Sequence, residues 1–330
     1  MPTSALPRPR LTALLEQMRG RRVVVVGDAM LDRYLIGDTE RISPEAPVPV
    51  VSVTERRLAL GGAANVAANV AALGGQAKLV AVVGADRDGE ALRGELGRLG
   101  IDDRFLLALP DRPTTTKTRV VARGQQVVRI DEEDAGELAA ETAARLAALA
   151  TEAIAQADAV LLEDYDKGVL HPRVIAATMQ AAAARGLPTV VDPKFRSFFA
   201  YRGATVFKPN RRELGAAIPG IDLSSARALV EAVGRLQVEN LLLTLGAGGM
   251  VLVNRDAAVP PHLIESEARE VYDVSGAGDT VTAWVGTALA AKATPIEAAE
   301  VANIAAGVEV AKRGVATVSP AEVLAAHRGA

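Results

Sequence analysis

The chain has 330 residues, and its 37 Lys and Arg against 40 Asp and Glu leave a formal net charge of −3. This balance argues against a nucleic-acid-binding protein, which would be basic. The absence of cysteine excludes disulfides, thiol nucleophiles and zinc–thiolate sites, and no apolar run is long enough to predict a membrane helix, so we expect a cytoplasmic protein without a membrane partner.

Strands and helices alternate along most of the sequence. Apolar runs rich in β-branched residues predict buried parallel strands at residues 22–27, 78–83, 159–162, 189–191, 205–207 and 241–245. Apolar residues three or four positions apart predict helices at residues 63–73, 87–99, 137–156, 172–185, 226–236, 276–290 and 295–312. This alternation predicts an α/β fold in which helices cover both faces of a mostly parallel sheet.

Two stretches interrupt this alternation. Residues 33–53 contain three prolines among alternating apolar residues, and residues 114–131 have the pattern of two strands with a turn at Gly124 and Gln125. Together they predict a small antiparallel sheet inserted into the α/β body, with irregular loops as the alternative.

Two nucleotide-binding motifs are absent. The first predicted strand is followed by Gly27-Asp-Ala-Met-Leu-Asp32, which lacks the second glycine of a dinucleotide-binding loop, and the chain has no Gly-Lys dipeptide for a phosphate-binding P-loop. Nicotinamide chemistry and Walker-type nucleotide binding are therefore disfavoured.

The strongest local motif is Asp273-Val-Ser-Gly-Ala-Gly-Asp279, which opens an apolar helix. The small residues Gly276, Ala277 and Gly278 let the backbone approach a ligand, and N–H groups at a helix start favour an anion. A carboxylate beside such an anion hole is useful if it takes a proton from a hydroxyl that attacks a phosphoryl group. The alternative is a glycine turn with Asp279 as a helix cap.

A second motif, Gly61-Gly-Ala-Ala-Asn65, also opens a predicted helix. Gly61 and Gly62 allow backbone contact with a polar ligand, and the Asn65 and Asn69 amides lie one turn apart on the same helix face. Amides in that position can hold sugar hydroxyls. A helix cap followed by ordinary polar residues remains the alternative.

These motifs resemble the two signatures of the ribokinase-like (PfkB) carbohydrate kinases. The first signature is matched by Gly61, Gly62, Asn65, Ala67, Gly74 and Gly84, and the second by residues 273–279. The resemblance covers nearly the whole chain. It implies one ribokinase-like domain over residues 1–330, a three-layer sandwich with a β lid formed by about 33–56 and 112–132.

The resemblance also implies roles for individual residues. Asp279 would be the catalytic base and Gly276, Ala277 and Gly278 its anion hole. Sugar contacts are expected from Asp32, Gly61, Gly62 and Asn65, with Asp28 as a second candidate that could equally cap a turn. ATP contacts are expected from Asn210, Glu213, Thr244, Gly246, Gly248, Gly249, Asn303 and Gly307.

Two ions are implied in the same way. Glu213, in the Asn-x-x-Glu motif that starts at Asn210, would hold Mg²⁺ through water, although such a pair is equally typical of a helix cap. Asp273 and Ser275 would lie near a monovalent ion such as K⁺.

The run Ile42-Ser-Pro-Glu-Ala-Pro-Val-Pro-Val50 is similar to one subgroup of the family, the D-glycero-β-D-manno-heptose 7-phosphate kinases. That similarity implies ATP-dependent phosphorylation of the anomeric hydroxyl, a place in ADP-heptose and lipopolysaccharide core synthesis, a homodimer, and a stand-alone kinase without a fused nucleotidyltransferase. The alternatives are another sugar or sugar-phosphate kinase of the family, or a regulator that binds a sugar phosphate without turnover.

If the sugar carries a phosphate group, we expect cationic side chains to bind that phosphate. Lys117 and Arg119 share one side of a predicted strand, and Lys167 and Lys194 each follow a strand, as does Asp164. We expect these five residues to contact the sugar phosphate, with solvated surface charges as the alternative for each cation. The neighbouring Glu163 departs from the subgroup pattern, and its role stays open.

Overall fold

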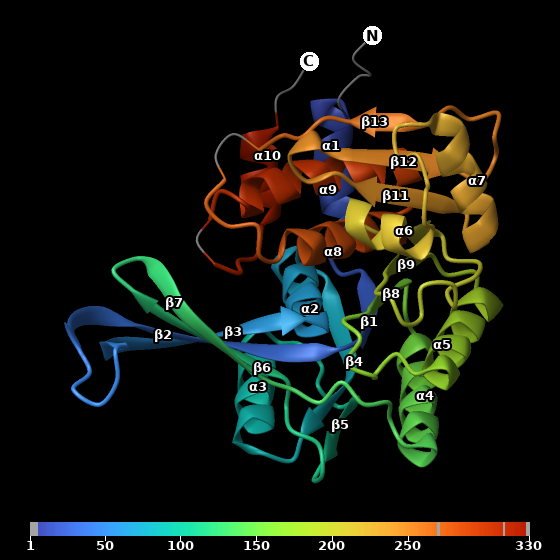
Figure 1. Ribbon diagram of the computed structural model, residues 1–330. Coiled ribbons are helices and arrows are strands. Elements are labelled where there is room, and N and C mark those ends of the chain that lie inside the picture. Colours follow the sequence, from blue (N-terminus) through green and yellow to red (C-terminus); the bar gives the residue numbers. More distant parts are fainter. Residues whose placement is uncertain (1–5, 269–270, 313, 328–330) are drawn as a thin grey trace.

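The computed structural model describes residues 6–268, 271–312 and 314–327. Its main sheet has nine strands (Figure 1), which are β1 (Arg22–Gly27), β4 (Gln76–Gly84), β5 (Leu106–Leu109), β8 (Ala159–Glu163), β9 (Thr189–Asp192), β10 (Val206–Phe207), β11 (Asn240–Thr244), β12 (Met250–Asn254) and β13 (His262–Ile264). Their spatial order is β13-β12-β11-β10-β9-β8-β1-β4-β5. All neighbouring strands from β5 to β11 pair in parallel, and only β12 runs against its neighbours. The predicted, mostly parallel sheet is confirmed.

Helices cover both faces of this sheet. One face carries α1 (Arg8–Met18), α2 (Ala63–Ala72), α3 (Arg87–Arg98), α8 (Ala277–Ala290), α9 (Pro295–Glu309) and α10 (Pro320–Ala326). The other carries α4 (Ala140–Ile154), α5 (Pro172–Ala184), α6 (Arg211–Ala217) and α7 (Ala226–Leu236). Successive residues of a strand point to opposite faces, so Val23 and Val25 join the first apolar core while Val24 and Val26 join the second.

A second sheet, here called the small sheet, projects from this body (Figure 1). It contains β2 (Ala29–Ile42), β3 (Pro49–Gly62), β6 (Thr116–Ala122) and β7 (Gln125–Glu132), in the order β3-β2-β6-β7. The β2–β3 and β6–β7 pairs are antiparallel as expected, but β2 and β6 pair in parallel. The first hairpin is longer than the predicted residues 33–56 because its pairing continues down to Ala29 and Gly62, at the main sheet.

Other boundaries differ in detail. The predicted helix at 137–156 begins only at Ala140, because the preceding segment is held as a loop: the Arg112 guanidinium donates to the backbone carbonyls of Asp134 and Gly136. Helices α1, α6 and α10 and strands β5 and β13 were not predicted from the sequence. In the described part of the chain, no helix combines the length and apolarity that crossing a membrane requires.

This topology places the candidate residues together. The carboxyl ends of neighbouring parallel strands meet at one edge of a sheet, where open α/β folds bind ligands. At that edge β8 ends with Glu163 and β9 with Asp192, while Lys208 follows β10. Helix α8 packs against β8 and β9, so its amino end, with Asp279, faces the same edge.

Candidate active site

The amino end of α8 is formed by the predicted glycine-rich motif. Gly276 is the residue before the helix and has φ of 95°, a left-handed conformation that favours glycine. Because glycine has no side chain, the cap position cannot accept a hydrogen bond from the N–H groups of the first turn. Asp279 is buried in that first turn. The amino end of α8 therefore presents backbone N–H groups and a carboxylate together, although the Ala277 N–H also donates weakly to the Val274 carbonyl at 3.4 Å.

Both oxygens of the Asp279 carboxylate accept hydrogen bonds from other elements. The Asn65 amide nitrogen donates to Oδ2 at 2.7 Å, and the Tyr165 hydroxyl donates to Oδ1 at 2.7 Å. Burial raises the pKa of Asp279 to about 6, while these two hydrogen bonds act to lower it. The pairing of Asp279 with side chains far away in the sequence makes it more than a local helix cap.

Two further carboxylates lie beside Asp279. Oxygen atoms of Glu163, Asp192 and Asp279 all lie within 4.8 Å of one another. Glu163 is fully buried, and neither of its oxygens has a hydrogen-bond donor among the described residues. Burial, followed by the Asp192 charge, raises the pKa of Glu163 well above its ordinary value. Burial and the neighbouring Asp192 charge therefore both favour the protonated form of Glu163.

A buried lysine balances this cluster. The Lys208 ammonium lies 2.7 Å from Asp192 Oδ2. Burial acts to lower the Lys208 pKa, but the Asp192 and Glu163 carboxylates outweigh it and raise the pKa. The Lys208 ammonium thus places a positive charge beside this acidic cluster. Asp192 and Lys208 were not identified from the sequence, although their positions at the carboxyl ends of neighbouring parallel strands could have indicated them.

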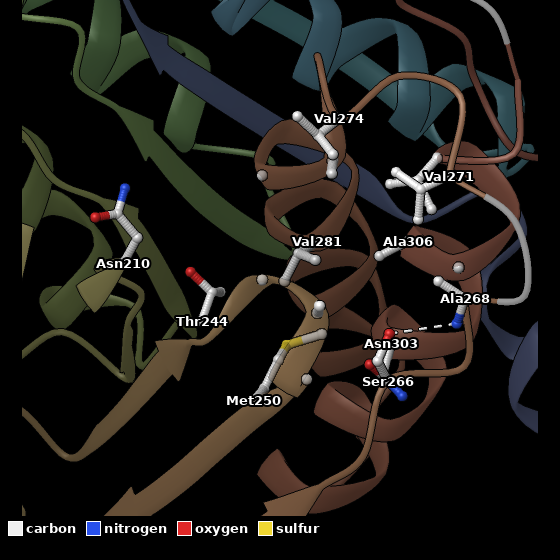
Figure 2. Close-up of a pocket in the computed structure, with 17 residues that line it drawn as sticks. Asn210, Thr244, Met250, Ser266, Ala268, Val271, Val274, Val281, Asn303 and Ala306 are labelled. Atoms are coloured by element: carbon white, nitrogen blue, oxygen red, sulfur yellow. Dashed lines mark hydrogen bonds between the residues drawn. The ribbon is translucent and has the colours of Figure 1, made fainter. Parts of the chain in front are cut away.

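A cavity of about 350 Å³ lies beside the amino end of α8 (Figure 2). Six predicted ATP contacts line it, namely Asn210, Thr244, Gly246, Gly249, Asn303 and Gly307. Ala277 and Gly278 of the predicted anion hole line it as well. The cavity therefore connects the predicted nucleotide residues with the amino end of α8, whereas Glu213 and Gly248 are not among its lining residues.

Figure 2 shows Asn210 and Thr244 on one side of the cavity and Val271, Ala306 and Asn303 on the other. Much of the wall is apolar, and the sequence analysis had not singled out its apolar members, Met250, Val271, Val274, Val281, Ala306 and Val310. A mostly apolar pocket with a few polar groups is typical of a small-molecule site.

Two polar pairs shape the ends of the cavity. The Asn303 amide donates to the Glu265 carbonyl at 2.7 Å and so fixes the segment that follows β13. At the other end, Asn210 and Glu213 form a capping box on α6: the Asn210 side chain accepts from the Glu213 N–H, and Glu213 Oε2 accepts from the Asn210 N–H at 2.8 Å. The structure therefore contains the helix cap that the sequence offered as one interpretation of this pair.

Glu213 is the residue that the resemblance assigns to Mg²⁺. Its second oxygen, Oε1, lies 2.5 Å from the Lys194 ammonium, so both oxygens are already engaged within the protein. An ion at this point would have to be held through water, which Mg²⁺ permits because it keeps several of its waters. For the monovalent ion, the structure shows only that Asp273 Oδ1 accepts the Ser275 N–H at 2.9 Å.

Among the predicted sugar contacts, Asp28 anchors a loop. Its buried carboxylate accepts backbone N–H groups of Tyr165 at 2.8 Å, Lys167 at 3.1 Å and Val169 at 3.1 Å. With these three hydrogen bonds Asp28 holds the loop after β8 in place. This arrangement corresponds to the turn-capping alternative.

Asp32 is buried and contacts the Arg119 guanidinium across the small sheet. A side chain at position 61 would place its Cβ only 2.9 Å from Asp32 Oδ2, which explains the need for Gly61. Gly62 has φ of 55°, again a conformation that favours glycine. The predicted glycine pair thus gives Asp32 room beside α2.

The other predicted sugar contacts are also paired within the protein. Lys117 lies 3.3 Å and Lys167 2.6 Å from separate oxygens of Glu133, and Lys117 also lies 3.1 Å from Asp131. The Asp164 carboxylate accepts the Tyr201 hydroxyl at 2.6 Å, and burial raises its pKa to about 6. The structure therefore brings Lys117 and Lys167 together, and places Lys194 with Glu213 near the nucleotide cavity.

Comparison with known proteins gives a consistent result. A family model described as pfkB family carbohydrate kinase matches residues 21–322. The Bifunctional protein HldE of Pelobacter propionicus is 46% identical over 323 residues, covering 97% of this chain and 66% of that protein. HldE of Rhodospirillum rubrum is 45% identical over 323 residues, covering 97% of this chain and 65% of its own length. The chain thus spans about two thirds of the length of these relatives.

Solved structures with low sequence identity share the fold. Ribokinase from Arabidopsis thaliana, complexed with ribose and ATP, superposes with a TM-score of 0.70 at 23% identity, covering 93% of this chain and 98% of that one. The tetrameric inhibited form of phosphofructokinase-2 from Escherichia coli gives 0.74 at 20% identity, covering 92% and 97%. With this fold, with both signature motifs at the edge of the sheet and with a family match over residues 21–322, the chain belongs to the pfkB family and is a carbohydrate kinase.

Proposed function

We propose that this kinase transfers the γ-phosphoryl group of ATP to the anomeric hydroxyl of D-glycero-β-D-manno-heptose 7-phosphate, giving the 1,7-bisphosphate. The observation that carries the proposal is that the nucleotide cavity ends at Ala277 and Gly278, next to the buried carboxylate of Asp279. The choice of sugar is supported by the run at residues 42–50, which resembles the heptose 7-phosphate kinases, and by the relatives named HldE.

Asp279 is the group that takes the proton. With a pKa of about 6 it is mostly ionised at pH 7, yet basic enough to accept a proton from the hydroxyl as that oxygen attacks phosphorus. The attack displaces ADP, and the hydroxyl proton ends on Asp279. General-base assistance of this kind contributes about 10²- to 10⁴-fold in rate.

The amino end of α8 stabilises the charge on the transferred group. Its first-turn N–H groups and the helix dipole favour an anion at this position. The Lys208 ammonium lies 3.5 Å from the point where a Cβ at Gly278 would sit, so a fixed positive charge stands beside the same spot. Donors that are already in place favour the transition state of phosphoryl transfer.

Mg²⁺, when bound with ATP, neutralises charge on the phosphates. In this chain Glu213 would hold it through water, and Lys194 beside Glu213 adds a cation to the same end of the cavity.

The sugar phosphate would be held on the other side by Lys117, Lys167 and Arg119. Each of these cations is paired with a carboxylate of the protein, so phosphate binding exchanges one anion for another. We propose that the small sheet acts as a lid that closes over the sugar and excludes water from the reacting phosphoryl group.

We also propose a cytoplasmic homodimer that works in ADP-heptose supply for lipopolysaccharide. The edge strand β7 of the small sheet is exposed throughout and presents Val127, Val128 and Ile130, which suits pairing with a second copy. Sedimentation equilibrium checks this directly. A monomer at all concentrations would contradict the dimer.

The decisive experiment measures ATP turnover by the purified chain with heptose 7-phosphate, unphosphorylated heptose, ribose and fructose 6-phosphate. We expect kcat/KM to be highest for heptose 7-phosphate. A higher value for another sugar would overturn the substrate assignment and leave the kinase family in place. Tight sugar-phosphate binding without turnover of any sugar would instead support a regulator.

A further inference from the structure

Tyr165 is a partner of the catalytic carboxylate to which neither the motifs nor the proposed mechanism gives a role. It lies in the loop after β8, and its hydroxyl donates to Asp279 Oδ1 at 2.7 Å. The Asn65 amide holds the other oxygen, Oδ2, at 2.7 Å. The Asp279 carboxylate is therefore held from two sides, by one donor on α2 and one on this loop.

The backbone of the loop that carries Tyr165 is held by several hydrogen bonds. The Tyr165 N–H donates to Asp28 Oδ2 at 2.8 Å, and the Lys167 and Val169 N–H groups bind the same buried carboxylate. The Arg112 guanidinium also donates to the Lys167 carbonyl. With its backbone anchored at these points, the loop can present the Tyr165 hydroxyl at one place without a large loss of entropy on each turnover.

We propose that Tyr165 is a positioning residue, whose hydroxyl orients the Asp279 carboxylate and keeps it ionised for proton abstraction. This inference rests on the proposed function of Asp279 as the base. A hydrogen bond to a carboxylate favours its charged form, and a donor of fixed position also restricts rotation of the carboxylate. Asn65 alone would hold only one oxygen.

The charges around Asp279 show why such a donor is needed. Glu163 on β8, Asp192 on β9 and Glu309 on α9 all face it, and burial raises the pKa values of Glu163 and Glu309. Lys208 is the cation that opposes them. In this acidic, buried setting a neutral donor stabilises the Asp279 charge without adding an ion that would compete for the phosphoryl group.

The test is the pH dependence of kcat in Tyr165→Phe. The substitution removes only the hydroxyl and keeps the ring beside the Lys194 ammonium, which lies 5.1 Å from the ring centroid. Loss of a hydrogen bond to a charged group should move the acid limb of the kcat profile upward by about one to two pH units. With the Asp279 pKa at about 6, the loss of rate should therefore be about 5- to 50-fold near pH 6 and about twofold or less near pH 8.

A matched control is Tyr201→Phe. Tyr201 also donates a buried hydroxyl to a carboxylate, Asp164, at 2.6 Å, but it does not contact Asp279. We expect its acid limb to stay where the unsubstituted enzyme has it. A profile for Tyr165→Phe that falls equally at every pH, or that matches Tyr201→Phe, would overturn the positioning role.

Two further measurements keep the inference separate from the proposed function. Thermal unfolding and ATP titration of Tyr165→Phe should match those of the unsubstituted enzyme, which shows that the variant is folded. Asp279→Asn tests the base itself: if it retains normal kcat, the proposed function fails. If Asp279→Asn is inactive and Tyr165→Phe has an unshifted profile, only the inference about Tyr165 fails.

Discussion

The two proposed sides of the active site are built differently. The proposed nucleotide side is a cavity of about 350 Å³ with a largely apolar wall, and its shape depends on small residues such as Gly307. The proposed sugar side is a set of charges, in which Lys117, Lys167 and Arg119 each contact an acidic side chain of the protein.

This difference indicates two ways of recognising a ligand. An apolar cavity selects by shape, because a misfitting group loses contacts or collides with the wall. A set of internal ion pairs selects by charge, because only a ligand that replaces the carboxylates can bind without leaving cations unpaired. The substitutions below test whether the two sides act separately, with Asp279 at their junction.

The largest effect is expected at that junction. Asp279→Asn should lower kcat about 10²- to 10⁴-fold, because an amide cannot accept the hydroxyl proton. Both substrates should still bind, which isothermal titration with ATP and with the sugar phosphate can establish. A near-normal kcat in a folded variant would show that Asp279 is not the base.

The next effect is on the sugar side alone. Lys117→Ala should weaken heptose 7-phosphate binding about 10- to 100-fold, the loss of one charge-assisted hydrogen bond to a phosphate, and leave the ATP affinity unchanged. Arg129→Ala is the matched control, since Arg129 also pairs with Asp131 but at the more exposed edge strand. Equal weakening by both variants would mean that the general charge of the small sheet matters, and not the site.

A smaller effect is expected on the nucleotide side. A Cβ at Gly307 would lie 3.0 Å from the Glu267 carbonyl carbon, so Gly307→Val should distort the cavity wall and raise the KM for ATP about tenfold. The sugar KM should change little, because the substitution is far from the small sheet's ion pairs. If the sugar KM rises by the same factor, the two sides are coupled.

A residue of this site can be predicted from the sequence when it belongs to a local motif, but not when it depends on which strands are neighbours in the fold. The motif at 273–279 is local, so both the helix start and the Asp279 carboxylate could be placed correctly. Tyr165, Asp192 and Lys208 could not be found in that way, because their importance depends on which strand ends lie side by side. Local patterns carry no such information.

The same reasoning explains two ambiguities. Asn210 and Glu213 fit both a helix cap and a nucleotide motif, because one capping box places both side chains at a helix start beside the cavity. The hairpins of the small sheet have local turn signals, whereas the parallel pairing of β2 with β6 joins distant segments and left no pattern in the sequence.

The smallest effect concerns stability. Glu309 is fully buried, and neither of its oxygens has a partner among the described residues. Burial, and then the charge of Asp279, raises its pKa from the ordinary 4.5 to about 8. The folded state therefore holds a proton that the unfolded chain has released, so this group's contribution to stability is complete below about pH 4.5 and is lost as pH rises through 8.

Glu309→Gln removes that titration. We expect the variant to gain a few degrees in Tm at pH 8.5 relative to the unsubstituted enzyme, and to differ little at pH 5. Differential scanning calorimetry at the two pH values gives the comparison. A Tm difference that does not depend on pH would show that Glu309 is not protonated in the folded protein.

The pairing of β2 with β6 also sets the order in which the molecule can assemble. In this pair Leu31 lies beside Thr116, and the intervening chain forms α2, β4, α3 and β5 of the body. Bringing the two ends of so long a segment together has a large entropic cost. This cost becomes smaller once the segment between them has folded compactly. The β2–β3 hairpin can therefore form early on its own, whereas the complete small sheet forms only after this part of the body has folded. In hydrogen exchange, the outer halves of its strands should open long before the main sheet does.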